Sequence, residues 1–268
     1  MSDGQRLQAG LRRRRVARWG VASALLLALA LGLLPLLHLH LRAAGLLLRF
    51  AGDGSPPEGL AAYGLHGFTE EDASFERDGT SIPARLYRPR GVENPPGLVI
   101  IHGIHQLGRN EPRLMRFARM MAGAGVAVLT PEVRSLADYR VEPGAIGVMG
   151  DAVRALRARL GPHTRPVGLM GLSFAGGLAL LAARDPAYAN DIGYVVTVGA
   201  HDDMARVARF FVTNEIPYPD GSALRLAAHE YGALVLVYEY AEGFFPPEDV
   251  AVAREVIRAA LKEDFNAA

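Results

Sequence analysis

The sequence predicts an α/β protein with a mostly parallel sheet flanked by helices, and three features indicate this class. Short apolar segments rich in Val and Ile recur between residues 97 and 200, as is typical of buried parallel strands. Segments with the helical spacing of apolar residues lie between them. Gly and Pro mark most of the junctions. Strands and helices that alternate in this way form a parallel sheet with right-handed crossovers.

The expected elements begin with a β-hairpin whose turn is Asp78-Gly79. Its strands are expected at 73–77 and 82–87. Further strands are expected at 98–102, 126–130, 167–172 and 192–200, and helices at 111–122, 145–160 and 174–184. After residue 201 the pattern changes to helices alone, at 204–213, 224–239 and 249–262.

The amino-acid composition excludes some classes of function. The 268 residues suffice for one catalytic domain and an additional segment, and half of them are hydrophobic. A net charge of +1 gives no indication of a nucleic-acid partner. The absence of cysteine excludes disulfides, thiolate catalysis and cysteine-based zinc sites. Lys262 is the only lysine.

The N-terminal region predicts a membrane anchor. Residues 19–41 form an apolar run long enough to cross a bilayer, and six arginines lie within residues 1–18. The positive-inside rule then places the basic tail in the cytoplasm and the catalytic part outside it. A linker is expected at 42–67. We expect an uncleaved signal anchor, and the alternative is a cleaved signal peptide.

The most informative segment surrounds Ser173. An apolar strand leads into Gly171-Leu172-Ser173, and small residues and an apolar helix follow. This is the layout of a nucleophile elbow, in which a serine on a strained turn needs small neighbours two positions before and after it. Gly171 and Ala175 occupy these positions. The alternative is a Gly-rich turn with an ordinary capping serine.

The chain resembles the α/β-hydrolases, in the style of dienelactone hydrolases and prolyl-oligopeptidase-like serine hydrolases. Segments 74–89, 101–103 and 171–177 carry the resemblance, which covers residues 68–201. It implies hydrolysis of a small-molecule ester or amide by Ser173, an oxyanion hole made by the backbone N–H groups of Ile104 and Phe174, and no cofactor or metal. It also implies that residues 202–268 are a helical cap.

We expect several polar residues to lie near the ends of the strands and to line the site. They are His102, His105, His201 and Asp202. For His102 we favour a role in ordering its loop over a role as a base. A metal at the His102-x-x-His105 pair is disfavoured, because no carboxylate or cysteine stands at ligand spacing beside it.

The resemblance also exposes a gap. In this superfamily the acid and the histidine of the triad follow the serine in the chain, on loops after two further strands. No such strands are evident after residue 201. We expect a truncated form that lacks the C-terminal strands; completion by another chain and a differently built triad are the alternatives.

An internal triad would use His201 or His229 as the base and Asp202 or Asp203 as the acid. Against it stands the simpler interpretation that one of these aspartates caps the next helix. The competing function is a non-catalytic, membrane-tethered binding or scaffold protein.

Overall fold

The computed structural model describes residues 3–52, 58–161 and 166–263. The chain divides into two units, Met1–Gly64 and Leu65–Ala268, and each is described by itself.

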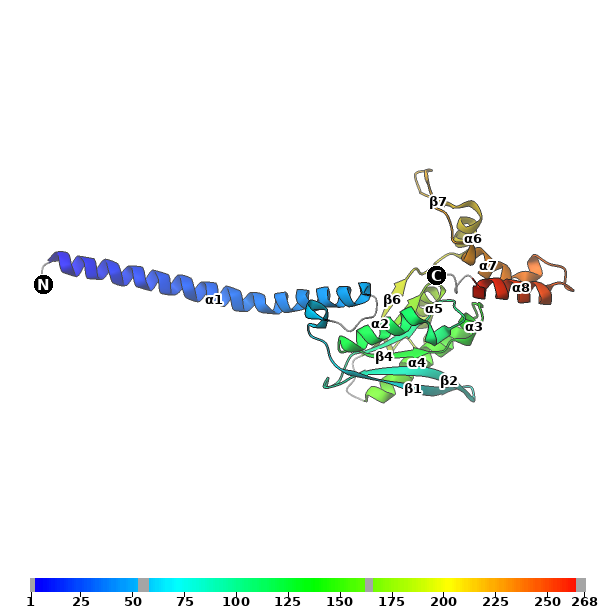
Figure 1. Cartoon of the computed structure of the whole chain (residues 1–268), viewed down its shortest axis with the longest axis horizontal. Coiled ribbons are helices and arrows are strands. Elements are labelled where there is room, and N and C mark those ends of the chain that lie inside the picture. Colours follow the sequence, from blue (N-terminus) through cyan, green and yellow to red (C-terminus); the bar gives the residue numbers. More distant parts are fainter. Residues whose placement is uncertain (1–2, 53–57, 162–165, 264–268) are drawn as a thin grey trace. The chain divides into compact units, whose positions relative to one another are not determined.

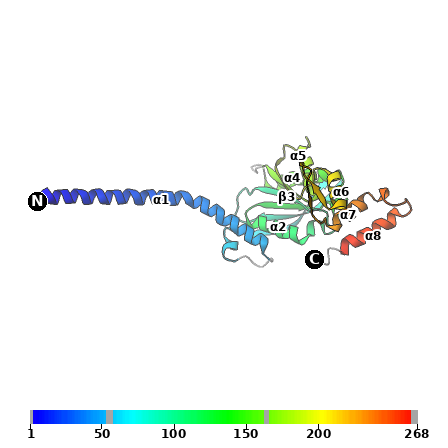
Figure 2. The same cartoon turned by 90° about the horizontal axis from the view of Figure 1, so that it is seen from above.

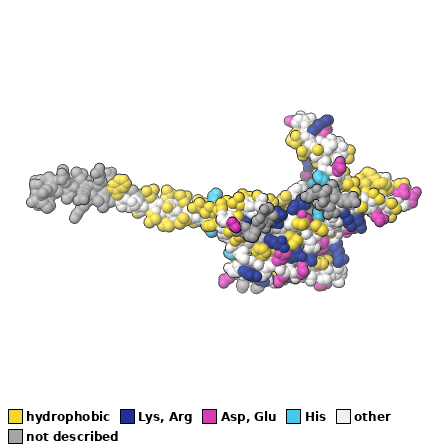
Figure 3. Space-filling view, viewed as in Figure 1, with side chains coloured by type: hydrophobic (Ala, Val, Ile, Leu, Met, Phe, Trp, Pro, Cys, Tyr) yellow, Lys and Arg dark blue, Asp and Glu magenta, His cyan; other side chains and the backbone are white. Residues whose placement is uncertain are grey.

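The first unit consists of helix α1 (Asp3–Ala51) and the short 3-10 helix η1 (Gly59–Ala62). Its part Ser23–Ala51 has a mean hydropathy of 2.2, and by length and composition it is able to cross a membrane. Apolar side chains cover this part of α1 (Figure 3). Since α1 continues to Ala51, the linker expected at 42–67 is wrong in its first ten residues: the apolar run resumes at Leu46 and the helix carries on through it.

The second unit is built on a six-stranded sheet in the order β1-β2-β4-β3-β5-β6 (Figure 1). Strands β3 to β6 are parallel to one another, whereas β2 is antiparallel to both of its neighbours. The predicted fold class, a mostly parallel sheet flanked by helices, is confirmed. The strands are β1 (Phe68–Arg77), β2 (Thr80–Pro89), β3 (Gly97–Ile101), β4 (Ala127–Pro131), β5 (Val167–Leu172) and β6 (Ile192–Val198).

The predicted hairpin turn is confirmed as well. Arg77 pairs with Thr80, so Asp78 and Gly79 are the two turn residues. Both have positive φ, 49° and 73°, which is the backbone that an Asp-Gly hairpin turn requires. The strands on either side are longer than their sequence patterns indicated, because pairing along the hairpin extends to Phe68 and Pro89.

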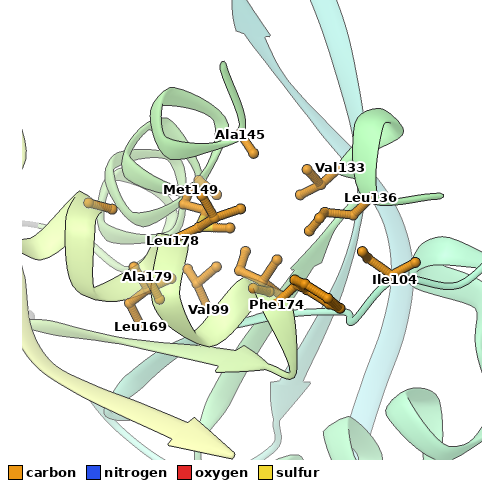
Figure 4. Packing of buried hydrophobic residues seen from close by; sticks show 14 of the residues in the cluster. Val99, Ile104, Val133, Leu136, Ala145, Met149, Leu169, Phe174, Leu178 and Ala179 are labelled. Carbon is orange, nitrogen blue, oxygen red and sulfur yellow. The ribbon is translucent and has the colours of Figure 1, made fainter. Parts of the chain in front are cut away.

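Helices cover both faces of the sheet. Helix α2 (Pro112–Gly123) packs on one face with a smaller cluster around Ile100 and Val128. On the other face α4 (Gly144–Leu160) and α5 (Phe174–Arg184) enclose the main core, which includes Val99, Met149, Leu169 and Leu178 (Figure 4). The short helices η2 (Gly108–Asn110) and α3 (Arg134–Ala137) follow β3 and β4 at their carboxyl ends.

Strand β6 forms one edge of the sheet, and its apolar side chains are exposed. Tyr194, Val196 and Val198 are 48%, 40% and 53% exposed. Their partners on β5 are Gly168, Met170 and Leu172, so all three lie on the face that α2 covers further along the sheet. Val195, on the opposite face, packs against the main core.

The C-terminal segment is mainly but not wholly helical. It comprises α6 (Met204–Thr213), β7 (Glu215–Pro217), β8 (Ala223–Arg225), α7 (Glu230–Glu239), η3 (Ala241–Gly243) and α8 (Val250–Glu263). None of the residues of α6 is buried, and α6 projects from the rest of the unit with the β7–β8 hairpin (Figure 1). In two views α7 and α8 lie side by side (Figures 1 and 2), and Arg254 of α8 donates to the carbonyl oxygen of Tyr238 in α7.

The helix expected at 224–239 is wrong in its first six residues. Residues 223–225 pair with 215–217 around the turn at Asp220-Gly221, and the helix begins only at Glu230. His229, expected inside that helix, is its N-cap and accepts a hydrogen bond from the Tyr231 N–H. Leu224 and Leu226 are two residues apart, which is the spacing of a strand face, and His229 caps the helix that follows.

Candidate active site

Ser173 occupies a strained turn between β5 and α5. Its φ and ψ are 55° and −128°, a conformation that non-glycine residues rarely adopt. Two hydrogen bonds hold the turn. The Ser173 N–H donates to the carbonyl oxygen of Val198 on β6 at 2.7 Å, and the Ser173 carbonyl oxygen accepts from the Gly176 N–H at 2.8 Å. The surrounding backbone therefore fixes the strained geometry.

The small residues around Ser173 are sterically required. A Cβ at Gly171 would overlap the carbonyl group of Ala175, and a Cβ at Gly176 would lie 2.6 Å from the Cβ of Ala200. Ala175 itself is fully buried. The elbow pattern in the sequence thus corresponds to close contacts between β5, α5 and the residues that follow β6.

The loop after β3 lies against this turn. A Cβ at Gly103 would be 3.4 Å from the Cβ of Ser173, so the backbone of this loop passes directly beside the serine. Ile104, the next residue, is buried in the same apolar cluster as Phe174 (Figure 4). Among the residues that the structure describes, neither the Ile104 N–H nor the Phe174 N–H has a hydrogen-bond acceptor.

Helix α5 adds to the electrostatics of the turn. It begins at Phe174, so the positive end of its dipole and its unpaired N-terminal amides lie next to Ser173. Negative charge that develops beside the serine is therefore stabilised by the helix as well as by individual N–H groups.

His102 orders the loop through both of its ring nitrogens. Its Nδ1 lies 2.8 Å from the carbonyl oxygen of Gly103, and its Nε2 accepts a hydrogen bond from the Val133 N–H at 3.1 Å. This pair of contacts requires the neutral tautomer with the proton on Nδ1. The side chain is almost wholly buried, and burial lowers the pKa of His102.

Two further polar groups lie near His102. An oxygen of Glu132 is 3.8 Å from the His102 Nε2, and the other accepts the Arg109 N–H at 3.1 Å. The buried His105 accepts the Leu107 N–H through its Nδ1 at 3.0 Å, and burial lowers its pKa. Within the described ranges no group of three His, Cys, Asp or Glu is placed to hold a metal ion.

His201 lies against the first turn of α5, and a Cβ at Gly177 would be 2.9 Å from the His201 carbonyl oxygen. The ring of His201 contacts the ring of Phe174 edge-on, with centroids 4.9 Å apart, and burial lowers the pKa of His201. Asp202 is exposed and pairs with Arg206 at 2.5 Å. Asp203 caps α6 by accepting from the N–H groups of Ala205 and Arg206.

The hydroxyl of Ser173 belongs to the strained turn between β5 and α5. In the part of the chain that the structure describes, no histidine or carboxylate is hydrogen-bonded to it. Each candidate histidine has other partners, and the acids expected for an internal triad serve α6 instead.

One contact of this site carries no signal in the sequence. Tyr231, in α7, donates its hydroxyl hydrogen bond to the carbonyl oxygen of Ile104 at 2.9 Å. The two residues are 127 positions apart, and the first six residues of the helix that was expected to carry Tyr231 are a strand and loop. Only the packing of α7 beside the β3 loop brings them together.

Comparison with known proteins finds likeness in solved structures alone. No protein-family model matches the chain, and no curated protein matches it. The matching structures include a dienelactone hydrolase from Anabaena variabilis, which is 22% identical with a TM-score of 0.42. The match covers 53% of this chain and 68% of the dienelactone hydrolase.

Two esterase structures match this chain to a similar extent. One is a hyperthermophilic esterase from the archaeon Pyrobaculum calidifontis, 21% identical with a TM-score of 0.43, matched over 65% of this chain and 56% of that one. The other is Est1E from Butyrivibrio proteoclasticus, 20% identical with a TM-score of 0.42, matched over 62% and 68%. The chain thus spans about two thirds or less of their length. The sequence predicted a resemblance to dienelactone hydrolases, and a dienelactone hydrolase is among the matching structures.

Proposed function

We propose that this chain carries the nucleophile and the oxyanion-binding groups of a serine hydrolase that acts on a small-molecule ester or amide. The observation that carries the proposal is the backbone of Ser173, with φ at 55° and ψ at −128°. A capping serine needs no such strain, because ordinary N-caps adopt extended backbone, as Asp203 does with φ at −142°. Strain of this kind persists where function maintains it.

The proposed reaction is acyl transfer to water. The Ser173 Oγ attacks the carbonyl carbon, its proton passes to a base, and the carbonyl oxygen takes up the negative charge. The N–H groups of Phe174 and Ile104 would donate to this oxygen. Collapse of the intermediate expels the alcohol or amine and leaves an acyl group on Ser173, which water then hydrolyses. No step of this sequence calls for a cofactor or a metal.

The second candidate function is that of a membrane-tethered binding or scaffold protein without catalysis. The absence of a base from the described contacts of Ser173 favours it. In this alternative the strained turn has no catalytic role, and Ser173 is no more reactive than an ordinary serine.

We also propose that α1 anchors the protein in a membrane. Its apolar part is long enough, and arginines precede it. The positive-inside rule would place the N-terminus in the cytoplasm and residues 65–268 on the other side. A signal sequence that is cleaved remains the alternative.

A fluorophosphonate probe separates the hydrolase from the scaffold. The full chain in detergent is incubated with the probe, with and without added imidazole as an external base, and the modified peptide is mapped by mass spectrometry. In this reaction the Ser173 Oγ–P bond forms, fluoride leaves and the hydroxyl proton passes to imidazole. The hydrolase proposal predicts labelling at Ser173 that imidazole accelerates.

The matched variants are Ser173→Ala, which should abolish the label, and Ser222→Ala in the β7–β8 loop, which should leave it intact. A chain that stays unlabelled with imidazole present, or that is labelled equally in both variants, would establish the scaffold alternative.

A further inference from the structure

The two peptide groups that flank Ile104 are held at both of their carbonyl oxygens. The Gly103 carbonyl oxygen is bonded to Nδ1 of His102, and the Ile104 carbonyl oxygen accepts from the hydroxyl of Tyr231. The second peptide is held at its other end too, because the His105 N–H donates to the carbonyl oxygen of Leu136 at 3.3 Å. Of the polar groups in these two peptides, only the Ile104 N–H has no acceptor among the described residues.

This pattern of anchors determines where the Ile104 N–H points. In a planar trans peptide the C=O and N–H bonds point in opposite directions. With the Gly103 carbonyl turned to His102, the Ile104 N–H is turned away from that ring. The next peptide has the Ile104 carbonyl turned to Tyr231, so the φ and ψ of Ile104 are constrained from both sides.

We infer that Tyr231 is a positioning residue, which holds the loop after β3 so that the Ile104 N–H stays available to an oxyanion beside Ser173. The inference rests on the proposed hydrolase function. It gives helix α7 a role distinct from covering the site: a side chain from the C-terminal segment sets the geometry of a backbone donor 127 residues earlier.

The surroundings of Tyr231 support a fixed orientation of its hydroxyl. Its ring contacts the ring of Tyr139 edge-on, with centroids 6.2 Å apart, and the buried Tyr139 in turn contacts Tyr238. His229, two residues before Tyr231, caps the start of the same helix. Aromatic packing and a capped helix start thus hold the Tyr231 side chain in the position that its hydrogen bond requires.

The test compares two tyrosines of the same helix. Tyr231→Phe removes only the hydroxyl that reaches Ile104, whereas Tyr238→Phe removes a hydroxyl that accepts from Arg258 in α8. For each full-length variant the rate of fluorophosphonate labelling of Ser173 is measured with imidazole present. Hydrogen–deuterium exchange is followed in peptides that contain residues 102–108.

Tyr231→Phe should slow labelling about 10-fold, since a displaced donor loses much of the 10²- to 10³-fold effect of an oxyanion-hole group. It should also speed exchange at the His105 amide. Tyr238→Phe should change neither. A purely structural role predicts that both variants unfold more easily while labelling of the folded protein is unchanged.

The outcomes distinguish this inference from the function on which it rests. If Ser173 is labelled in the wild type and Tyr231→Phe is labelled equally fast, the positioning role is overturned and the hydrolase proposal stands. If Ser173 of the wild type is not labelled at all, the hydrolase proposal fails and the positioning role fails with it.

Discussion

The α-carbon of Gly171 faces the main-chain carbonyl of Ala175, and a methyl group at position 171 would overlap it. The two residues lie on either side of Ser173, at the end of β5 and in the first turn of α5. Gly171 pairs with both β3 and β6 in the sheet, and Ala175 is fully buried, so neither moves easily. The elbow therefore depends on the absence of a side chain at this position.

Gly171→Ala should lower the free energy of unfolding by about 1–3 kcal/mol, the usual cost of inserting a methyl group into a packed interior. Urea unfolding of the full chain in detergent measures it. Gly144→Ala is the matched control, because no atom lies within 4 Å of the added methyl group at the start of α4. The control should lose no stability, since alanine favours the helix. Equal losses in both variants would contradict the steric account.

Acid should destabilise the fold through His102. Its folded pKa lies below the ordinary value of 6.5 because the ring is buried. The unfolded chain thus binds the proton more readily, and His102 contributes stability that is complete above pH 6.5 and is lost as the pH falls toward the folded pKa. His102→Gln should flatten this part of the pH profile by up to about 1.4 kcal/mol per pH unit.

Some pH dependence should persist in that variant, because burial also lowers the pKa values of His105 and His201. Unfolding free energies measured from pH 7 to pH 5 test the prediction. Profiles of wild type and His102→Gln with the same slope over this range would refute the assignment of His102 as a buried neutral histidine.

The exposed edge at β6 should promote self-association, because an apolar edge strand pairs readily with other chains. Val196→Lys should raise the concentration at which light scattering detects aggregates, without lowering the folded stability. Val195→Lys is the matched variant on the opposite face, where the side chain packs against the core. It should destabilise the protein by several kcal/mol, since it buries a charge. Similar behaviour of the two variants would show that the faces are wrongly assigned.

The membrane proposal has a direct test in fractionation. Carbonate extraction of the full chain should leave it in the membrane pellet, whereas a form without residues 1–50 should be recovered in the soluble fraction. Quantitative release of the full chain by carbonate would indicate cleavage instead of anchoring.

Many of the strands and helices could be predicted from short patterns of neighbouring residues in the sequence. The hairpin turn at Asp78-Gly79, the strands with Val and Ile runs, and the helices at 111–122 and 145–160 all depend on residues adjacent in sequence, and the structure has them within one or two residues. The strained turn at Ser173 was predictable for the same reason, since its small neighbours lie two residues away on either side.

The parts that were missed depend on contacts between distant residues or on competition between local structures. The helix was expected to begin at residue 224, but residues 223–225 pair with 215–217 in a short hairpin, which no pattern within one segment reveals. The contact of Tyr231 with Ile104 joins residues that share no motif. Residues 1–2, 53–57, 162–165 and 264–268 lie outside the described residues, so the ends of the first and last expected segments stay predictions.

The central claim is that Ser173 is a nucleophile, and acetylation by p-nitrophenyl acetate tests it most directly. The chain suits this experiment, because it has no cysteine and Lys262 is its only lysine, which leaves few competing sites. Without a base on Ser173, steady turnover of the ester by these 268 residues should be negligible. With imidazole present, mass spectrometry should find one acetyl group on the peptide that contains Ser173 and none there in Ser173→Ala. Acetylation confined to Lys262, the histidines or the N-terminus, at equal rates in both proteins, would contradict the account.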